Sequence, residues 1–252
     1  MEYARVGTSG LYVSKIILGA ASYGSSKWQD WVLDEEDAFP LLEYAFKNGI
    51  KTHAYSNSNT IKRYSIPREQ LVILMKIFYI IDPATHPPIS AMIDKTKAYL
   101  MNRVGLSYKY ILDTVAASIK RLDRDICPDE IMQALNDVVE SGQVRYLGAS
   151  LIAAWEFQKM QFIAERHRRY KFISMQNYYN LLLLARGVLA HVWEDWNIVQ
   201  GGEENLVNER IVSRVEEVVK KRGVPIAMVA LAWCLNKGVY LITGLGSWKR
   251  VD

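Results

Sequence analysis

A lysine interrupts one of the most apolar stretches of the sequence. Residues 71–77 read Leu-Val-Ile-Leu-Met-Lys-Ile, a short run that is typical of a buried parallel strand. Burying an ammonium group is costly unless it is paired. Lys76 is therefore a candidate for a functional role near the carboxyl end of that strand. A surface lysine at the strand end is the alternative.

A second candidate for chemistry is the small basic cluster Ser247-Trp248-Lys249-Arg250. A hydroxyl group and two cations can bind a phosphate through charge-assisted hydrogen bonds. A solvated tail would have the same composition, so the cluster alone does not decide between the two. The sequence has no Gly-X-Gly-X-X-Gly element, which argues against a Rossmann dinucleotide site.

Other kinds of site find little support in the sequence. Cys127 and Cys234 are not spaced with histidines as metal ligands. We predict no metal site, and we expect two buried thiols rather than a disulfide. The basic run Arg166-His167-Arg168-Arg169 is interpreted as the solvated end of a helix. A phosphate or nucleic-acid patch is the alternative, although such proteins usually carry a longer basic stripe.

The composition indicates a globular protein. The chain has 252 residues, of which 50% are hydrophobic and 23% charged, and its net charge is +4. This length suffices for one large domain. The amino-terminal residues lack the apolar segment of a signal peptide, and no run of about 18 apolar residues predicts a membrane span. We therefore expect a cytoplasmic location, with no membrane or nucleic-acid partner; the oligomeric state is unknown.

Strands and helices alternate along most of the chain. A hairpin is predicted over 3–16, and strands over 15–20, 71–77, 144–148, 172–176 and 239–243. Helices are predicted over 34–49, 108–122, 128–141, from the strand 144–148 to about 168, 207–222 and 225–236. The order predicts parallel α/β units, in a barrel or a doubly wound sheet. The alternation breaks twice, because no strand separates the helices 108–122 and 128–141 and none is evident in 181–206.

The first 50 residues begin a series of stretches whose order matches that of a known family. The stretches are Gly19 through Leu33, Ile66 through Glu69, Asn102 through Ser107, Ser118 to Leu122, Ser141 through Ser150, Ser174 through Leu181, Lys221 to Leu235 and Gly246 through Arg250. In this order they resemble the aldo-keto reductases, in the fungal aryl-alcohol-dehydrogenase branch. They cover most of the chain, and their order rather than any single motif carries the resemblance.

The resemblance implies a fold and a reaction. The fold would be α/β, a TIM-type (β/α)8 barrel with an N-terminal β-hairpin, incomplete because about six of the eight strands are recognisable. Residues 1–252 would form a single domain. The reaction would be hydride transfer between NADP and an aldehyde, ketone or alcohol, and the family branch points to an aromatic one. In this family a tyrosine donates the proton, a lysine assists it, an aspartate holds the lysine and a histidine orients the carbonyl group.

The resemblance also assigns residues. Tyr55-Ser56-Asn57 is similar to the turn after the family's second strand, so Tyr55 matches the catalytic tyrosine and Lys76 the catalytic lysine. A phenol with a pKa near 10 is a poor acid, and a nearby ammonium group lowers that pKa. The remaining matches would bind NADP. Ser150 and Gln176 would contact the nicotinamide amide, and Tyr178 (or Tyr179) would stack on the nicotinamide ring. The 2′-phosphate would be bound by Ser247, Lys249 and Arg250.

The sequence departs from the family pattern at several places. No carboxylate precedes Tyr55, since the chain reads Lys51-Thr52-His53-Ala54. His53 is interpreted as a solvated loop residue, although it could fill a polar gap there. The strand with the family's histidine is missing where Asp125-Ile126 passes to Cys127. A further strand is lost after Leu182, and the sequence ends before the family's closing helices.

Three hypotheses follow from this mixture of retained and missing parts. The chain is an NADP-dependent carbonyl or alcohol oxidoreductase that uses Tyr55 and Lys76, or a redox-inactive relative that binds a ligand or does non-redox chemistry, or a shortened gene product of an active parent. Missing internal strands would interrupt the hydrogen-bond ladder of the barrel and expose a sheet edge.

Overall fold

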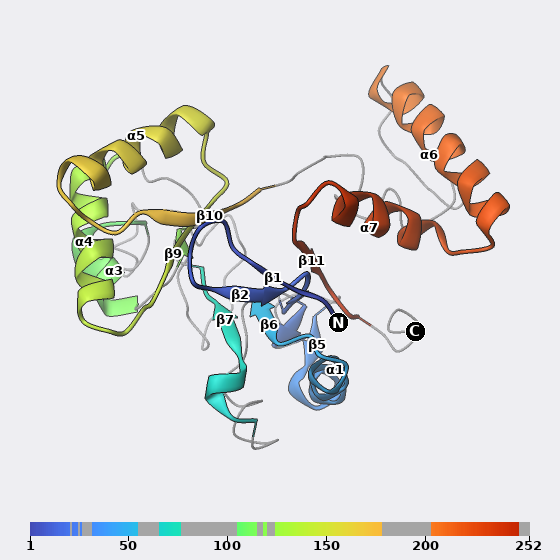
Figure 1. Cartoon of the computed structure of the whole chain (residues 1–252), viewed down its shortest axis with the longest axis horizontal. Coiled ribbons are helices and arrows are strands. Elements are labelled where there is room, and N and C mark those ends of the chain that lie inside the picture. The colour runs from blue at the N-terminus through green and yellow to red at the C-terminus, as the bar shows by residue number, and fades with distance from the viewer. Residues whose placement is uncertain are drawn as a thin grey trace. The chain divides into compact units, whose positions relative to one another are not determined.

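A computed structural model describes residues 1–20, 22–24, 26, 32–54, 66–76, 105–114, 118–119, 124–177 and 203–246 (Figure 1). The chain divides into two compact units. The first comprises Met1–Asn177 together with Ile242–Asp252, and the second comprises Tyr178–Leu241.

The first unit begins with the predicted hairpin, in which β1 (Tyr3–Arg5) pairs antiparallel with β2 (Tyr12–Ser14). A sheet follows with the strand order β11-β3-β6-β7. Its members are β3 (Ile16–Gly19), β6 (Thr52–Ala54), β7 (Val72–Leu74) and β11 (Leu241–Thr243). β6 pairs parallel with both β3 and β7. Two short strands, β4 (Tyr23–Gly24) and β5 (Leu33–Asp34), form a separate parallel pair.

Helix α1 (Glu35–Lys47) packs on this sheet through Phe39 and Leu42, which contact Leu18 of β3 in one buried cluster. Asp34 precedes the helix as predicted, but its side chain does not cap it. The carboxylate instead accepts hydrogen bonds from the backbone N–H and the hydroxyl group of Ser26, at 2.9 and 2.8 Å. The helix ends as expected before Gly49, whose φ of +85° favours glycine. A 3₁₀ turn, η1 (Arg68–Gln70), leads into β7.

The other sheet of the first unit has the order β10-β9-β8, and both pairings are parallel. Its strands are β8 (Ser118–Ile119), β9 (Leu147–Ser150) and β10 (Phe172–Gln176). Helices α3 (Tyr108–Thr114), α4 (Pro128–Glu140) and α5 (Ala154–Arg166) accompany it. A continuous buried cluster joins these elements, with Ile111, Ile131, Leu135 and Met160 fully enclosed. This cluster is the largest core among the described residues.

Two predicted boundaries in this region are wrong. The helix predicted over 108–122 ends at Thr114, and Ser118–Ile119 is a strand beside β9. Ser118 and Ile119 form backbone hydrogen bonds with β9, and a helical pattern in the sequence does not reveal such a partner. Pairing with a distant strand overrides the local helix propensity here. The strand predicted over 144–148 lies at Leu147–Ser150, because the backbone pairs where β10 runs beside it.

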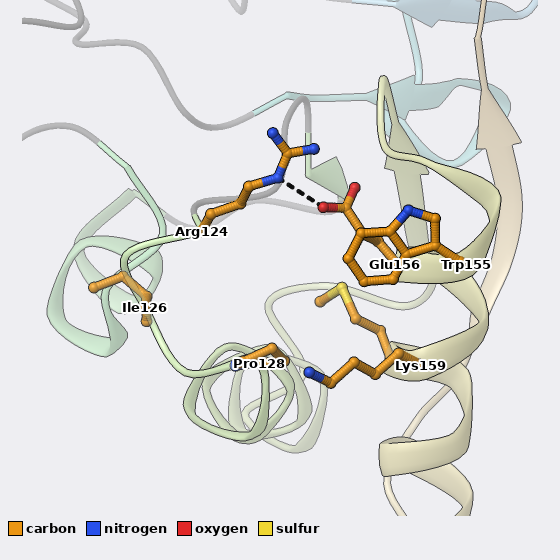
Figure 2. Close-up of a pocket in the computed structure, with 7 residues that line it drawn as sticks. Arg124, Ile126, Pro128, Trp155, Glu156 and Lys159 are labelled. Atoms are coloured by element: carbon orange, nitrogen blue, oxygen red, sulfur yellow. Dashed lines mark hydrogen bonds and ion pairs between the residues drawn. The ribbon is translucent and has the colours of Figure 1, made fainter.

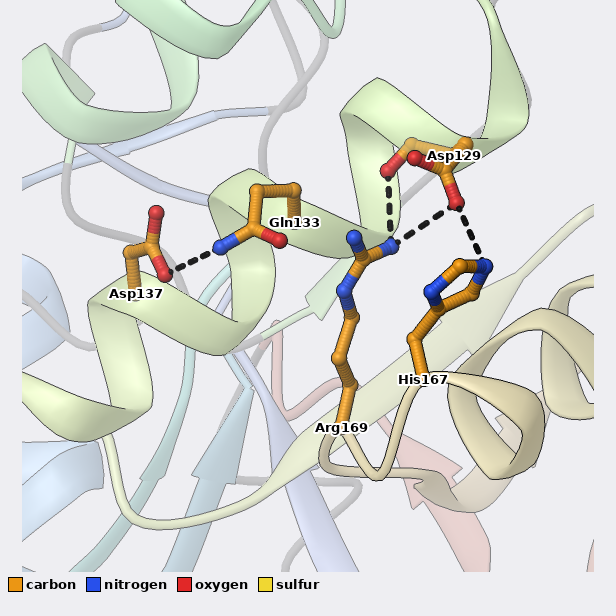
Figure 3. A network of polar contacts seen from close by, with 5 residues as sticks. All are labelled: Asp129, Gln133, Asp137, His167 and Arg169. Atoms are coloured by element: carbon orange, nitrogen blue, oxygen red, sulfur yellow. Dashed lines mark hydrogen bonds and ion pairs between the residues drawn. The ribbon is translucent and has the colours of Figure 1, made fainter.

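The basic run that follows α5 is not simply solvated. The Arg169 side chain donates to the carboxylate and the carbonyl oxygen of Asp129, at 3.0 and 3.1 Å, and is only 11% exposed (Figure 3). His167 lies 3.4 Å from the same carboxylate. Figure 3 also shows the hydrogen bond between Gln133 and Asp137 within α4. These contacts tie the end of α5 to the first turn of α4, so the run is partly structural.

The second unit contains α6 (Glu203–Arg222) and α7 (Ile226–Asn236), close to the two helices predicted there. Val212, Ile226, Ala230, Cys234 and Leu241 form its buried cluster. Cys234 is thus buried as expected, whereas Cys127 is exposed, which corrects the prediction for that thiol. Both cysteines are free.

The α/β class with parallel sheets is confirmed. The described strands form separate sheets, so closure into a barrel stays a prediction. No helix in the described part of the chain is long and apolar enough to cross a membrane.

Candidate functional site

Two of the predicted catalytic residues follow neighbouring strand ends. β6 and β7 run parallel, with Ala54 level with Leu74 at their carboxyl ends. Tyr55 is the residue after Ala54 but lies outside the described residues, whereas Lys76 lies two residues beyond Leu74 and is partly buried. Because side chains alternate between the two faces of an extended chain, Lys76 lies on the same face as Leu74. The carboxyl edge of parallel strands is where ligands of α/β proteins bind.

His53 does not serve this edge. It is 1% exposed on β6, and its register partner is Leu18, which packs against α1. Because level residues on parallel strands share a face, His53 faces α1, whereas Thr52 and Ala54 face the opposite side. Its Nε2 lies 3.0 Å from the carbonyl oxygen of Ile50, and burial lowers the pKa of its ring. The interpretation as a solvated loop histidine is therefore wrong, and His53 does not take the place of the missing family histidine.

A second tyrosine of the first unit, Tyr23 in β4, is a poor proton donor. The phenol of Tyr23 donates to the carbonyl oxygen of Leu245 at 2.7 Å. Burial raises the pKa of Tyr23 to about 12, against the opposing effect of that hydrogen bond. Its proton is therefore harder to release than that of an ordinary phenol.

Two of the predicted cofactor residues lie side by side. Ser150 ends β9, Gln176 ends β10, and the two are register partners. Ala149 and Met175, one residue earlier on each strand, pack with the helical core. By alternation, Ser150 and Gln176 point to the opposite face. The hydroxyl group of Ser150, a residue that is 1% exposed, and the primary amide of Gln176 thus lie at the same level of one sheet face.

The next residues on these strands also interact. The backbone N–H of Leu151 donates to Oδ1 of Asn177 at 2.7 Å. Leu151 has a φ of +55°, a left-handed conformation that is unusual for a residue with a Cβ atom. Neither Leu151 nor Asn177 is among the site residues that the sequence predicts. Asn177 was visible as the neighbour of Gln176, but nothing in the sequence marks Leu151 as left-handed.

A surface pocket of about 260 Å³ lies beside the first turn of α5 (Figure 2). Its lining residues are Arg124, Ile126, Pro128, Trp155, Glu156, Lys159 and Met160. Glu156 is 2% exposed, and its carboxylate accepts from Nε of Arg124 at 2.8 Å and from the backbone N–H of Ala153 at 3.0 Å. The second bond satisfies the backbone N–H of Ala153, the residue that precedes α5, as the N3 carboxylate of a capping box does. Glu156 thus caps the helix that follows Ser150.

Replacement of Glu156 by glutamine should make the protein less stable at neutral pH but not in acid. The Arg124 hydrogen bond holds the pKa of Glu156 below its usual 4.5, helped by the Ala153 hydrogen bond and opposed by burial. A lowered pKa in the folded state stabilises above the unfolded value, and this contribution is lost as the pH falls through the folded value. We expect a loss of about 1 kcal/mol at pH 7, measured by urea unfolding, that shrinks as the pH falls below about 4.5.

The control for this prediction is Glu165→Gln in the same helix. Glu165 pairs with Lys171 at 3.2 Å, but both side chains are largely exposed, so the change should be within about 0.5 kcal/mol. Equal effects of the two substitutions, or a Glu156→Gln effect that persists unchanged in acid, would contradict the role of Glu156.

The predicted site is therefore only partly visible. Lys76, Ser150 and Gln176 lie within the described residues, and the structure brings Ser150 and Gln176 together. Tyr55, Tyr178, Ser247, Lys249 and Arg250 lie outside them. No cluster of His, Cys, Asp and Glu that could hold a metal ion occurs in the described part of the chain. The paired hydroxyl and amide can exchange hydrogen bonds with a carboxamide, which both donates and accepts.

Comparison with known proteins adds independent evidence. The family model described as "Aldo/keto reductase family" matches residues 15–202. The chain is 41% identical to versiconal hemiacetal acetate reductase of Aspergillus parasiticus, over 312 residues that cover 100% of this chain and 91% of the relative. It is 36% identical to a putative aryl-alcohol dehydrogenase of Schizosaccharomyces pombe, with 99% and 89% covered, and 35% identical to one of Saccharomyces cerevisiae, with 100% and 91% covered.

The alignment with the reductase of Aspergillus parasiticus is longer than this chain. It spans 312 positions, whereas this chain has 252 residues. Since the whole chain is covered, many positions of the relative have no counterpart here. This agrees with the internal losses that the sequence predicts.

Proposed function

Since this chain belongs to the aldo/keto reductase family of oxidoreductases, we propose that it reduces an aldehyde or ketone, or oxidises the alcohol, with NADP. The substrate is a small carbonyl compound or alcohol. Several relatives are named for aryl alcohols, and we propose an aromatic substrate for this chain. The relatives named above are fungal proteins, and a role in fungal secondary metabolism belongs to the same proposal.

The observation that carries the proposal is the shared level and face of Ser150 and Gln176. A hydroxyl group and a primary amide suit the carboxamide of a nicotinamide ring. We propose that Tyr178 stacks on that ring and that Ser247, Lys249 and Arg250 bind the 2′-phosphate, which would favour NADP over NAD. When bound, the cofactor supplies the hydride, and the chain supplies position and electrostatics.

The proton would come from Tyr55, assisted by Lys76. The support is that these residues follow the carboxyl ends of β6 and β7, which pair directly. An ammonium group beside a phenol favours the phenolate, so the phenol releases its proton more readily to a carbonyl oxygen. We further propose that the whole chain forms one catalytic domain, an incomplete (β/α)8 barrel in which Ser150, Gln176 and Lys76 face the interior.

A second candidate is a relative that binds the dinucleotide or another ligand without redox turnover. Two observations favour it. The segment 51–54, where the family's aspartate is expected, contains no carboxylate, and His53 faces α1 instead of the strand edge. The losses implied by the longer alignment are a further reason to test activity directly.

One experiment decides between these candidates. The purified chain is titrated with NADPH, followed by the cofactor's fluorescence, and an aromatic aldehyde is then added while NADPH oxidation is recorded. We expect saturable binding followed by aldehyde-dependent oxidation. Binding without oxidation across a panel of aromatic and aliphatic aldehydes would refute the reductase and support the second candidate, and absence of binding would refute both dinucleotide roles.

A further inference from the structure

One hydrogen bond ties the carboxyl ends of β9 and β10 together just beyond the proposed cofactor residues. The N–H of Leu151 donates to Oδ1 of Asn177 at 2.7 Å. The preceding residues, Ser150 and Gln176, are register partners. The bond therefore links the two strands one residue beyond Ser150 and Gln176, the residues that would bind the carboxamide.

The residue that donates this bond, Leu151, has an unfavourable backbone conformation. Leu151 adopts a φ of +55°, where the Cβ atom approaches the backbone too closely. Its side chain is 39% exposed, so burial of the leucine contributes little to fixing that conformation. Strained residues of this kind persist where their surroundings hold them in place, and they cluster at functional sites.

The conformation of Leu151 determines how the chain leaves β9. The connection from Ser150 to α5 comprises 151–153. A left-handed residue at its start turns the chain sharply directly after Ser150, the register partner of Gln176. If Leu151 relaxed to an extended conformation, the end of β9 would shift and the two side chains would no longer meet one ligand group together.

We propose that Asn177 is a positioning residue for the dinucleotide site: its amide oxygen holds Leu151 in the left-handed conformation and thereby keeps Ser150 and Gln176 at one level for a carboxamide. This inference rests on the proposed function for the identity of the ligand. It assigns a role to a residue that does not itself contact the cofactor.

The test uses three variants of the full chain and two measurements, the Kd for NADPH and the midpoint of urea unfolding. Asn177→Ala should raise the Kd about tenfold and lower the midpoint, because a backbone donor loses its acceptor. Asn177→Asp keeps an acceptor oxygen and should stay within about twofold of the parent Kd. Leu151→Gly in the Asn177→Ala background should recover the Kd and part of the midpoint, because glycine adopts positive φ without support although the N–H of residue 151 still lacks its acceptor.

A matched control separates positioning from general destabilisation. Oδ1 of Asn136 in α4 accepts from the backbone N–H of Tyr170 at 3.3 Å, two residues before the start of β10 and so at the strand end opposite to Gln176. Asn136→Ala removes the same kind of bond and should lower the midpoint without changing the Kd. A parent-like Kd for Asn177→Ala, or no recovery on adding Leu151→Gly, would overturn the proposal. If the parent chain itself does not bind NADPH, the proposed function fails, and the midpoints of the same variants still decide whether Asn177 holds Leu151.

Discussion

Substitution of Tyr55 by phenylalanine should lower kcat for an aromatic aldehyde by about a hundred- to ten-thousand-fold, the usual contribution of general acid catalysis. The change removes one oxygen atom and keeps the ring, so the Kd for NADPH should stay near that of the parent. Measured together, the two constants separate loss of the proton donor from loss of the fold.

Two further variants sharpen this result. Lys76→Met should also lower kcat, and adding Tyr55→Phe to it should lower kcat little further, because residues that act as one unit are not additive. Tyr108→Phe is the matched control: its phenol donates to Asp137 at 2.6 Å on the exposed side of α3 and α4, so kcat should not change. Activity of Tyr55→Phe equal to that of the parent would refute Tyr55 as the proton donor.

The elements that the sequence predicted well are those whose signals are local. β10 occupies the predicted residues, and α4 runs from Pro128 to Glu140, within one residue of the prediction. A short apolar run fixes the strand, and helical spacing followed by Gly142, whose φ is +76°, fixes the helix. Such patterns need no knowledge of distant parts of the chain.

The elements that were mispredicted depend on distant partners. Ser118–Ile119 is a strand because β9 lies beside it, and Asp34 leaves α1 uncapped because Ser26 binds its carboxylate. Local propensity contains neither fact. The same holds for Arg169, whose partner Asp129 lies 40 residues earlier in the chain.

The candidate site shows the same division. Ser150, Gln176 and Lys76 were assigned through the family resemblance, and the register of the strands places the first two side by side. The left-handed Leu151 could not be predicted, because its conformation depends on Asn177, 26 residues later. His53 was misread because its burial follows from register with Leu18 rather than from its neighbours in sequence.

The missing segments have a structural consequence. In the described sheets, β7 is last in the order β11-β3-β6-β7 and β8 is last in β10-β9-β8. The family resemblance predicts that a strand with the family's histidine is missing between the segment 105–122 and α4, close in sequence to β8. An unpaired parallel edge can recruit another chain. We expect the buried cluster of α3, α4 and α5 to keep the ends of β9 and β10 in place.

That core is testable at Leu135, which is fully buried in α4 within the cluster that packs on Ala149 and Met175. Leu135→Ala removes buried methyl groups and leaves a cavity, so it should lower the free energy of unfolding by about 2–5 kcal/mol. The measurement is urea unfolding followed by far-UV circular dichroism. This loss would be a large fraction of the roughly 5–15 kcal/mol by which folded domains are typically more stable than the unfolded chain.

Leu112→Ala in α3 is the control, because that leucine is 38% exposed and its loss should cost less than about 1 kcal/mol. Ser150 and Gln176 lie on the sheet face opposite to Leu135. The folded fraction of Leu135→Ala should therefore bind NADPH with the parent's Kd, whereas Asn177→Ala changes that Kd in a more stable protein. Equal stability losses for Leu135→Ala and Leu112→Ala would contradict a packed core behind β9 and β10. That core could then not be what holds Ser150 and Gln176 in place.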